Sequence, residues 1–233
     1  MRILVTRPQP GAEQTAARLA QLGHEPVLLP LTRIEGLSVA ETGAEFDAGV
    51  ASSVNSIRHA PRWLLAALQG KPVHVVGKAT AAAVRASGLR VGEIAEGAAG
   101  LAEQLAGSRP GTRFAYLCGR VRLPLFQERM KAAGQDVLPF EVYDTLPIPC
   151  LPVEAASRIG SPVDAVLLYS ALAARAWLTL VSEPALARMM AQAWALCLSR
   201  RIAAELAGWP RVQAAERADE EALLELVQQN AQA

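Results

Sequence analysis

The stretch Arg2–Leu31, RILVTRPQPGAEQTAARLAQLGHEPVLLPL, has a counterpart of the same design at Arg113–Val142, RFAYLCGRVRLPLFQERMKAAGQDVLPFEV. Each reads as an apolar strand, a loop, an amphipathic helix, a glycine and a second apolar strand. The glycines expected to end the two helices are Gly23 and Gly134, which are 134 − 23 = 111 residues apart. A repeated unit of this length predicts two similar lobes.

Two further pairs of segments repeat at nearly the same offset. The segment FDAGVASS at 46–53 resembles VDAVLLYS at 163–170, and their aspartates are 164 − 47 = 117 residues apart. The segment ATAAAVRASG at 79–88 resembles RRIAAELAG at 200–208, and the closing glycines are 208 − 88 = 120 residues apart. The chain thus carries two successive copies, and two similar lobes suggest a cleft.

Expected strands and helices alternate along the chain. Short apolar runs such as Pro72–Val76 are typical of buried parallel strands, and Ala12–Leu22 has the spacing of an amphipathic helix. We expect one helix over Asn55–Leu68, which Pro61 should kink or restart, and a connection over Thr32–Glu45. We expect a helix over Ala171–Val181, a short strand over Val212–Ala214 and a stiff connector around Pro147, Pro149 and Pro152. The pattern predicts an α/β fold of two similar lobes, each a parallel sheet with helices on both faces.

The composition excludes several classes of protein. The chain has 233 residues, is 52% hydrophobic and carries a net charge of +1, so no basic field indicates nucleic-acid binding. The start turns polar too soon for a signal peptide, and no run reaches the roughly 18 apolar residues of a membrane helix. The three cysteines lie far apart without CxxC spacing, which favours reduced thiols and a cytoplasmic location.

The sequence lacks the usual signatures of nucleotide, metal and nucleophile sites. It has neither GxGxxG nor GxxxxGK[ST], and no metal site is expected because His24, His59 and His74 are isolated. We expect His24 and His59 at the surface and His74 in a strand. A Ser-His-Asp triad stays open on residue order, although no GxSxG supports it. Cys118, at a strand end, reads more readily as a core residue than as a nucleophile.

The junctions between strands and helices are the candidate binding positions. Ligands of parallel sheets lie beyond the carboxyl ends of the strands, and helix N-termini with nearby hydroxyls favour anions. Serine and threonine are also the preferred helix caps, so capping alone explains any single position as well. The candidate binding residues are Arg7, Ser52, Ser53, Gly77, Lys78, Thr80, Gly119, Arg120, Ser170, Ser199 and Arg201.

Tyr143 lies in the segment FEVYDT at 140–145, where the second copy's second strand ends. A tyrosine there would face the cleft or pack against the chain that joins the lobes. Its ordinary pKa is about 10, so it would be a proton donor at neutral pH. Packing of the ring against the connecting segment is the alternative interpretation.

The ordered set of short segments resembles the uroporphyrinogen-III synthase family over essentially the whole chain. These segments are VTRP at 5–8, LGHE at 22–25, LPL at 29–31, FDAGVASSVNSI at 46–57, VVGKATAAAV at 75–84, CG at 118–119 and VYDT at 142–145. The resemblance implies two α/β domains between which the chain crosses twice. Residues 1–34 and 149–233 would form one domain, 46–139 the other, and 35–45 with 140–148 a two-stranded connector.

The resemblance also implies a function. The chain would be a cofactor-free, monomeric lyase that expels the hydroxyl of hydroxymethylbilane, inverts the terminal pyrrole ring and closes uroporphyrinogen III. The strand-end residues would hold the carboxylates of this linear tetrapyrrole, and Tyr143 would be the catalytic acid. The family's Gly-Pro-Thr-Thr-like turn is replaced by Ser199–Ile202, where Arg201 would bind a carboxylate instead. A non-catalytic binding protein for a polycarboxylate and a nucleotide-dependent transferase are the alternatives.

Overall fold

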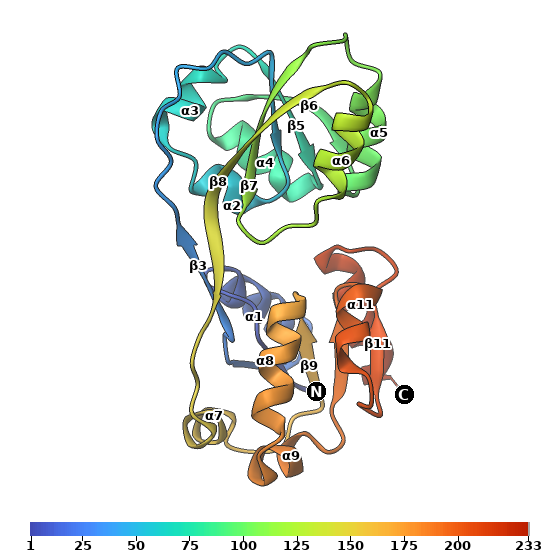
Figure 1. Cartoon of the computed structure of the whole chain (residues 1–233). Helices are drawn as coiled ribbons and strands as arrows, with labels where there is room; N and C mark the ends of the chain where they lie inside the picture. Colours follow the sequence, from blue (N-terminus) through green and yellow to red (C-terminus); the bar gives the residue numbers. More distant parts are fainter. Residues whose placement is uncertain (233) are drawn as a thin grey trace. The chain divides into compact units, whose positions relative to one another are not determined.

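The chain folds into two compact units in the computed structural model, which describes residues 1–232 (Figure 1). The first unit comprises residues 1–33 and 146–233, and the second comprises 34–145. The chain therefore leaves the first unit after residue 33 and returns to it at residue 146. Both ends of the sequence build the same unit.

The first unit contains a five-stranded sheet in which every neighbouring pair of strands is parallel. Its strands, in order across the sheet, are β11 (Val212–Ala214), β10 (Trp194–Cys197), β9 (Ala165–Leu168), β1 (Arg2–Val5) and β2 (Glu25–Leu28). Its helices are α1 (Gly11–Gln21), α7 (Pro152–Ile159), α8 (Ala171–Val181), α9 (Pro184–Met190), α10 (Arg200–Ala203), the 3-10 helix η1 (Ala204–Leu206) and α11 (Glu220–Ala231). Leu4 packs against α7, α8 and α9, whereas Ile3 and Val5 pack against α1 and α11. Helices thus cover both faces of this sheet.

The second sheet has six strands and the same layered plan. In order across the sheet they are β3 (Thr32–Gly36), β8 (Asp136–Pro147), β7 (Arg113–Gly119), β4 (Ala48–Ala51), β5 (Pro72–Val76) and β6 (Arg90–Ala95). The helices of the second unit are α2 (Val54–Arg58), α3 (Arg62–Ala67), α4 (Lys78–Ala86), α5 (Ala98–Ala106) and α6 (Leu125–Ala132). Val50 packs against α5 and α6, and Ala51 packs against α2, α3 and α4. The predicted α/β class with helices on both faces is confirmed.

Strands β3 and β8 join the two units and run antiparallel. The Ile148 N–H donates to the Leu31 carbonyl at 2.9 Å, and the Leu37 N–H donates to the Val142 carbonyl at 2.9 Å. The residue numbers of one segment therefore rise as those of its partner fall, which is the pattern of antiparallel pairing. The second sheet is therefore mixed at this edge, where a wholly parallel sheet was expected. Of the segment Thr32–Glu45, which was expected as a connection, the first residues form β3 and pair with β8.

The two sheets have equivalent strand orders. In the first sheet, β2, β1, β9, β10 and β11 follow one another, and β8, β7, β4, β5 and β6 do so in the second. Strands β1 and β2 open the first sequence copy, whereas β9, β10 and β11 close the second copy. Each sheet thus combines the opening strands of one copy with the closing strands of the other, as the blue and the orange-to-red segments of the first unit show (Figure 1).

Prolines set three helix boundaries. The expected helix Asn55–Leu68 is two helices, because it restarts at Pro61, which has an extended ψ of 150° and precedes α3. Pro152 was expected to stiffen a connector, but it opens α7, and Pro184 opens α9, a helix that was not predicted. A proline is well suited to the first turn of a helix, where its missing N–H has no intrahelical partner.

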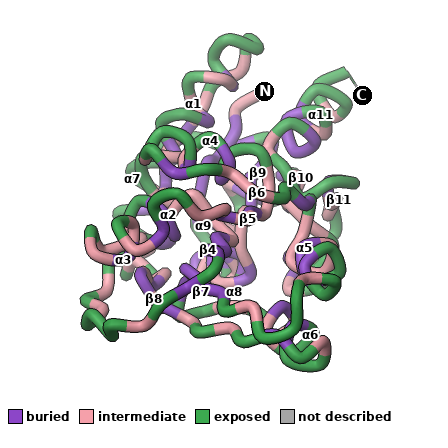
Figure 2. Tube along the Cα trace, turned by 90° about the horizontal axis from the view of Figure 1, so that it is seen from above, coloured by how far each residue is buried: buried purple, intermediate pink, exposed green. Residues whose placement is uncertain are grey.

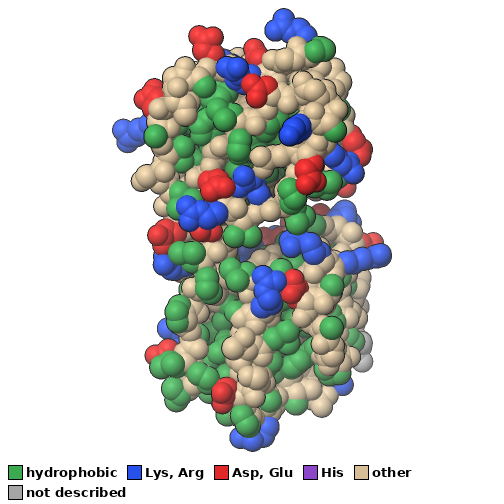
Figure 3. All heavy atoms as spheres, viewed as in Figure 1, with side chains coloured by type: hydrophobic (Ala, Val, Ile, Leu, Met, Phe, Trp, Pro, Cys, Tyr) green, Lys and Arg blue, Asp and Glu red, His purple; other side chains and the backbone are tan. Residues whose placement is uncertain are grey.

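Burial follows the sheets, and the surface charges are mixed. In Figure 2 the buried positions line the strands and the inward sides of helices such as α5 and α6. Basic and acidic side chains are interspersed on the face shown in Figure 3, in keeping with the net charge of +1. No helix within residues 1–232 is long and apolar enough to cross a membrane.

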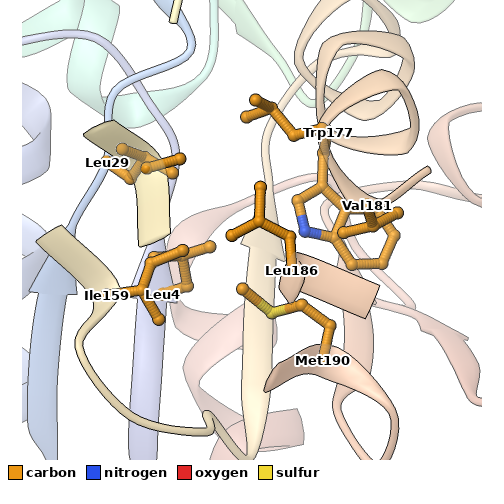
Figure 4. Close-up of a pocket in the computed structure, with 9 residues that line it drawn as sticks. Leu4, Leu29, Ile159, Trp177, Val181, Leu186 and Met190 are labelled. Atoms are coloured by element: carbon orange, nitrogen blue, oxygen red, sulfur yellow. The ribbon is translucent and has the colours of Figure 1, made fainter. Parts of the chain in front are cut away.

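The core of the first unit contains a small cavity of about 10 Å³ (Figure 4). Leu4, Ile159, Leu186 and Met190 are among the apolar side chains that line it. The indole Nε1 of Trp177 lies in this region without a hydrogen-bond partner. A void of this size is at the lower limit for one water molecule, and its lining is apolar. This cavity is therefore a packing defect rather than a substrate site.

Candidate functional site

The structure places the predicted site residues at the carboxyl ends of the strands of each unit. In the second unit, Ser52 and Ser53 follow β4, Gly77 and Lys78 follow β5, Gly119 ends β7, and Tyr143 lies within β8. In the first unit, Arg7 follows β1, Ser170 follows β9, and Ser199 and Arg201 follow β10. Because the strands concerned are parallel, these residues share one edge of their own sheet.

Tyr143 is held against two other predicted residues, Ser53 and Gly119. Its phenol is hydrogen-bonded to the Ser53 side chain. A Cβ atom at Gly119 would lie 2.8 Å from Tyr143 Cζ and 3.0 Å from the phenol oxygen, so the ring occupies the space beside this glycine. Burial raises the pKa of the Tyr143 phenol, which therefore keeps its proton at neutral pH.

Ser53 has two roles in this arrangement. It is the N-cap of α2, with a φ of −158°, and its hydroxyl accepts a hydrogen bond from the Asn55 N–H at 3.2 Å. Its neighbour Ser52 is hydrogen-bonded to a second phenol, Tyr116, whose pKa is also raised by burial. Sequence reasoning missed Tyr116, because a tyrosine inside a buried strand has no motif. The capping interpretation holds for Ser53, but the contact with Tyr143 comes in addition.

Two arginines near Tyr143 are already paired with carboxylates. Arg120 Nη1 lies 3.2 Å from Asp144 Oδ2, and Arg120 Nε lies 3.5 Å from Glu141 Oε2. Arg122, which the sequence did not single out, donates from Nη1 to Glu141 Oε1 at 2.8 Å. The Arg122 hydrogen bond is the largest cause of the lowered pKa of Glu141. Any ligand anion at Arg120 would therefore compete with these carboxylates.

The start of α4 has no side-chain cap. Gly77 is the N-cap residue, and its φ of +82° belongs to the left-handed region that glycine adopts without strain. Lys78 is the first helical residue and is exposed, and Thr80 in the first turn is only 4% exposed. The first N–H groups of α4 are thus not satisfied by a capping side chain.

Arg7 lies in a network of polar side chains in the first unit. Arg7 Nη1 donates to Thr15 Oγ1 at 3.1 Å and to Glu220 Oε1 at 3.0 Å. The Arg7 guanidinium carbon lies 4.5 Å from the centre of the Tyr169 ring. Sequence reasoning missed Thr15, Tyr169 and Glu220. Only the position of Tyr169, directly before Ser170 at a strand end, could have indicated it.

The two serines of the first unit differ in their bonding. The Ser170 hydroxyl caps α8 by accepting a hydrogen bond from the Ala173 N–H at 3.1 Å. Ser199 is the N-cap residue of α10 but makes no side-chain cap hydrogen bond. Arg201, in α10, is exposed. Capping accounts for the bonding of Ser170, whereas the Ser199 hydroxyl caps nothing.

The histidines and cysteines do not form a reactive centre. His24 and His59 are half-buried rather than at the surface, since His24 lies against the N-terminal amine and the His59 ring is 6.4 Å from that of Tyr143. Burial raises the pKa of Cys118 to about 11, which opposes formation of a thiolate. Residues 1–232 contain no group of three or more His, Cys, Asp or Glu side chains that could hold a metal ion.

Comparisons with known proteins identify the family. The model of the family described as uroporphyrinogen-III synthase HemD matches residues 13–225. No curated protein matches this chain in sequence.

Two solved structures have the same fold. A uroporphyrinogen III synthase from Thermus thermophilus is 23% identical, with a TM-score of 0.59, and the match covers 100% of this chain and 99% of that one. A uroporphyrinogen-III synthetase from Helicobacter pylori is 16% identical, with a TM-score of 0.66, and the match covers 98% and 99%. At these identities the likeness shows the fold alone.

Proposed function

Since the chain belongs to the uroporphyrinogen-III synthase family, we propose that it converts hydroxymethylbilane, a linear tetrapyrrole, to uroporphyrinogen III and water without a cofactor. The family makes it an enzyme of porphyrin biosynthesis, and this proposal adds the hydro-lyase chemistry and the residues. The observation that carries it is the half-buried, protonated phenol of Tyr143, hydrogen-bonded to Ser53 at the carboxyl end of the second sheet.

In the proposed mechanism Tyr143 is the general acid. Its proton passes to the terminal hydroxyl of the substrate, the carbon–oxygen bond breaks, and the hydroxyl leaves as water. The resulting carbon electrophile is attacked by the terminal pyrrole ring at the carbon that already bears its methylene bridge, which gives a spiro intermediate. The bond from that ring carbon to the old bridge then breaks, and the released methylene carbon bonds to the free α-carbon of the same ring, so that the ring is inverted in the product. The ring carbon that has formed the new bond then loses a proton, and this proton restores the phenol. Gly119 matters because any side chain there would displace the Tyr143 ring.

The remaining predicted residues are proposed to hold substrate carboxylates. Lys78 and the uncapped N–H groups at the start of α4 would bind carboxylates in the second unit. Arg7, Ser199 and Arg201 would do so in the first unit. Holding a flexible chain so that its two ends meet is a positioning task, and it explains why the residues concerned are donors rather than nucleophiles.

The proposal is tested by the identity of the product. Hydroxymethylbilane generated enzymatically closes spontaneously to the type I isomer, so the chain should divert it to the type III isomer. The isomers are separated chromatographically after oxidation to porphyrins. Type I product at the same rate with and without the protein would refute the proposal. Tetrapyrrole binding in a calorimeter without turnover would identify a non-catalytic binding protein instead.

We further propose that the chain acts in the cytoplasm as a monomer. All three cysteines are free, and Cys118 and Cys197 are buried, as in proteins of reducing compartments. The hydrogen-bonded site residues Arg7 and Tyr143 find their partners within their own units. Light scattering of the purified protein tests the oligomeric state.

A further inference from the structure

The guanidinium of Arg7 is fixed by residues of α1, of α11 and of the segment that follows β9. Nη1 donates to Thr15 of α1 and to Glu220, the first residue of α11. The guanidinium carbon lies over the ring of Tyr169, which follows β9. A Cβ atom at Gly11, the first residue of α1, would lie 2.6 Å from Arg7 Nε and 2.9 Å from Nη2. The close approach therefore depends on a glycine at position 11.

The carboxylate of Glu220 is the centre of this network. Its Oε1 accepts hydrogen bonds from Arg7, from the Thr15 hydroxyl and from the Tyr169 phenol, the last at 3.4 Å. Thr15 is fully buried. Three side-chain donors converge on one oxygen, so the positions of Arg7 and Glu220 are set by more than a single surface ion pair.

The network leaves one edge of the guanidinium for another acceptor. Neither Glu220 nor Thr15 uses the Nε–H and Nη2–H donors, which lie parallel on one side of the planar group. Two parallel N–H donors match the two oxygens of a carboxylate. Gly11 makes room for the guanidinium itself, because a side chain at this position would overlap Nε and Nη2.

We propose that Thr15, Tyr169 and Glu220 are positioning residues that hold this edge of Arg7 ready for one carboxylate of the tetrapyrrole, and that Gly11 lets the guanidinium take this position. The inference rests on the proposed function. A guanidinium that is already fixed loses little conformational entropy when the substrate binds, so the network contributes to substrate affinity. The effect should appear in KM rather than in kcat, because Arg7 is proposed to bind the substrate and takes no part in the proton transfer.

The competing interpretation is that the Arg7–Glu220 pair only fastens α11 to the rest of the unit. In that case its loss would lower stability and leave KM unchanged. The two interpretations thus differ in the quantity that each substitution changes.

Gly11→Ala is the sharpest test. The new methyl group would meet the end of a flexible side chain, so Arg7 moves and the fold is kept. We expect KM to rise about tenfold, which corresponds to the loss of one oriented contact, with kcat within about twofold. The melting temperature should stay or rise, since alanine is favoured within helices.

Gly100→Ala in α5 is the matched control. The nearest atom to a Cβ at Gly100 is the Ala95 Cβ, 3.9 Å away, so nothing is displaced. KM should not change in this control. A Gly11→Ala protein whose KM equals that of the control would overturn the inference.

A second test removes the charge of Glu220 and asks whether the effect passes through Arg7. Glu220→Gln should raise KM about fivefold, and it should have no further effect in an Arg7→Ala background, because coupled residues are not additive. Glu221→Gln is the control, since the Glu221 carboxylate pairs with Arg18, at 2.7 Å, whereas the carboxylate that Arg7 contacts is that of Glu220. Arg18 also lies 3.6 Å from Glu220 Oε2, so the control retains a cation beside Glu220.

The outcomes separate this inference from the proposed function. Additive effects of Glu220→Gln and Arg7→Ala, or an Arg7→Ala protein with unchanged KM, would overturn the inference while type III product still supports the function. Failure of the unaltered protein to form the type III isomer would refute the proposed function and, with it, the inference.

Discussion

The two units are anchored by the same contacts but differ in what they present at their strand ends. In the first unit, Asp164 Oδ2 accepts a hydrogen bond from the Arg2 N–H at 2.6 Å. In the second unit, Asp47 Oδ2 accepts one from the Arg113 N–H at 2.8 Å. Each aspartate thus ties the closing strands of one sequence copy to the opening strand of the other. The ties that hold the exchanged strands together are preserved in both units.

The strand ends have diverged. The first unit has a charged network around Glu220, which begins α11, whereas α5 of the second unit begins with Ala98. Thr15 donates to Glu220, but its counterpart in the second copy, Phe126 at 15 + 111, packs on Tyr116 at 4.8 Å between ring centres. The difference indicates that a repeated scaffold can keep a fixed cation in one unit and a neutral proton donor in the other.

The largest expected effect concerns the proton donor of the second unit. Tyr143→Phe should lower kcat about 10- to 100-fold, because the leaving hydroxyl loses its general acid. Formation of the type III isomer under saturating substrate measures this. KM should change little, since the ring is kept beside Gly119.

Tyr116→Phe is the matched control for this prediction. It removes a phenol that is hydrogen-bonded to Ser52 at the same sheet edge. We expect a loss of about 1 kcal/mol of stability from the missing hydrogen bond, with kcat nearly unchanged. If Tyr143→Phe were as active as Tyr116→Phe, Tyr143 would be a packing residue. The second unit would then not supply the proton donor that distinguishes it from the first.

The next prediction concerns Tyr169 of the first unit. When the segments 46–53 and 163–170 are aligned, Tyr169 corresponds to Ser52. Burial, and then the charge of Glu220, raise the pKa of the Tyr169 phenol to about 12. The unfolded chain has a tyrosine pKa of about 10, so above pH 10 it releases a proton that the folded chain retains, and stability falls as pH rises. Relative to Tyr169→Phe, the protein should lose about 1.4 kcal/mol by pH 11.

Urea unfolding of both proteins at pH 9 and pH 11 checks this prediction. Tyr116 and Tyr143 are present in both proteins, so their own titration cancels in the difference. An equal change in both proteins between the two pH values would show that Tyr169 is not held in its protonated form.

A smaller effect tests whether the anchoring contacts are equivalent. Asp47→Ala and Asp164→Ala should each cost about 1 kcal/mol, because each removes one hydrogen bond to a backbone N–H at the sheet edge. Denaturant midpoints of the two proteins should fall by similar amounts. A loss confined to one of them would show that the two units do not depend on their ties equally.

Much of the fold was predictable because its buried elements carry a clear pattern. The runs Pro72–Val76, Ala171–Val181 and Val212–Ala214 were expected with the bounds that the structure shows. Strand β3 was missed because its sequence, TRIEG, has one large apolar residue and is largely exposed. It is a strand because it pairs with β8, whose residues lie about a hundred positions further along the chain.

The site was predictable only as a set of positions. The motifs place Tyr143, Ser53 and Gly119 at strand ends, but their mutual contact depends on the order of β8, β7 and β4 in the sheet. Glu220 could not be predicted, because its partner Arg7 lies 213 residues away in sequence. That the residues of either set bind substrate stays a prediction.

The smallest expected effect compares the basic residues that begin corresponding helices, Lys78 in α4 and Arg201 in α10. Arg201 is exposed, so its contact with a carboxylate would be screened by water, and Arg201→Ala should raise KM only about two- to fivefold. Lys78 is exposed as well and lies beside the uncapped N–H groups of α4, so Lys78→Ala should raise KM by a similar factor. Arg200→Ala, which removes the exposed neighbour of Arg201, is the control and should leave KM unchanged. Equal effects of Arg200→Ala and Arg201→Ala would show that only the general positive charge of α10 matters, and the first unit would then bind its carboxylates chiefly through Arg7.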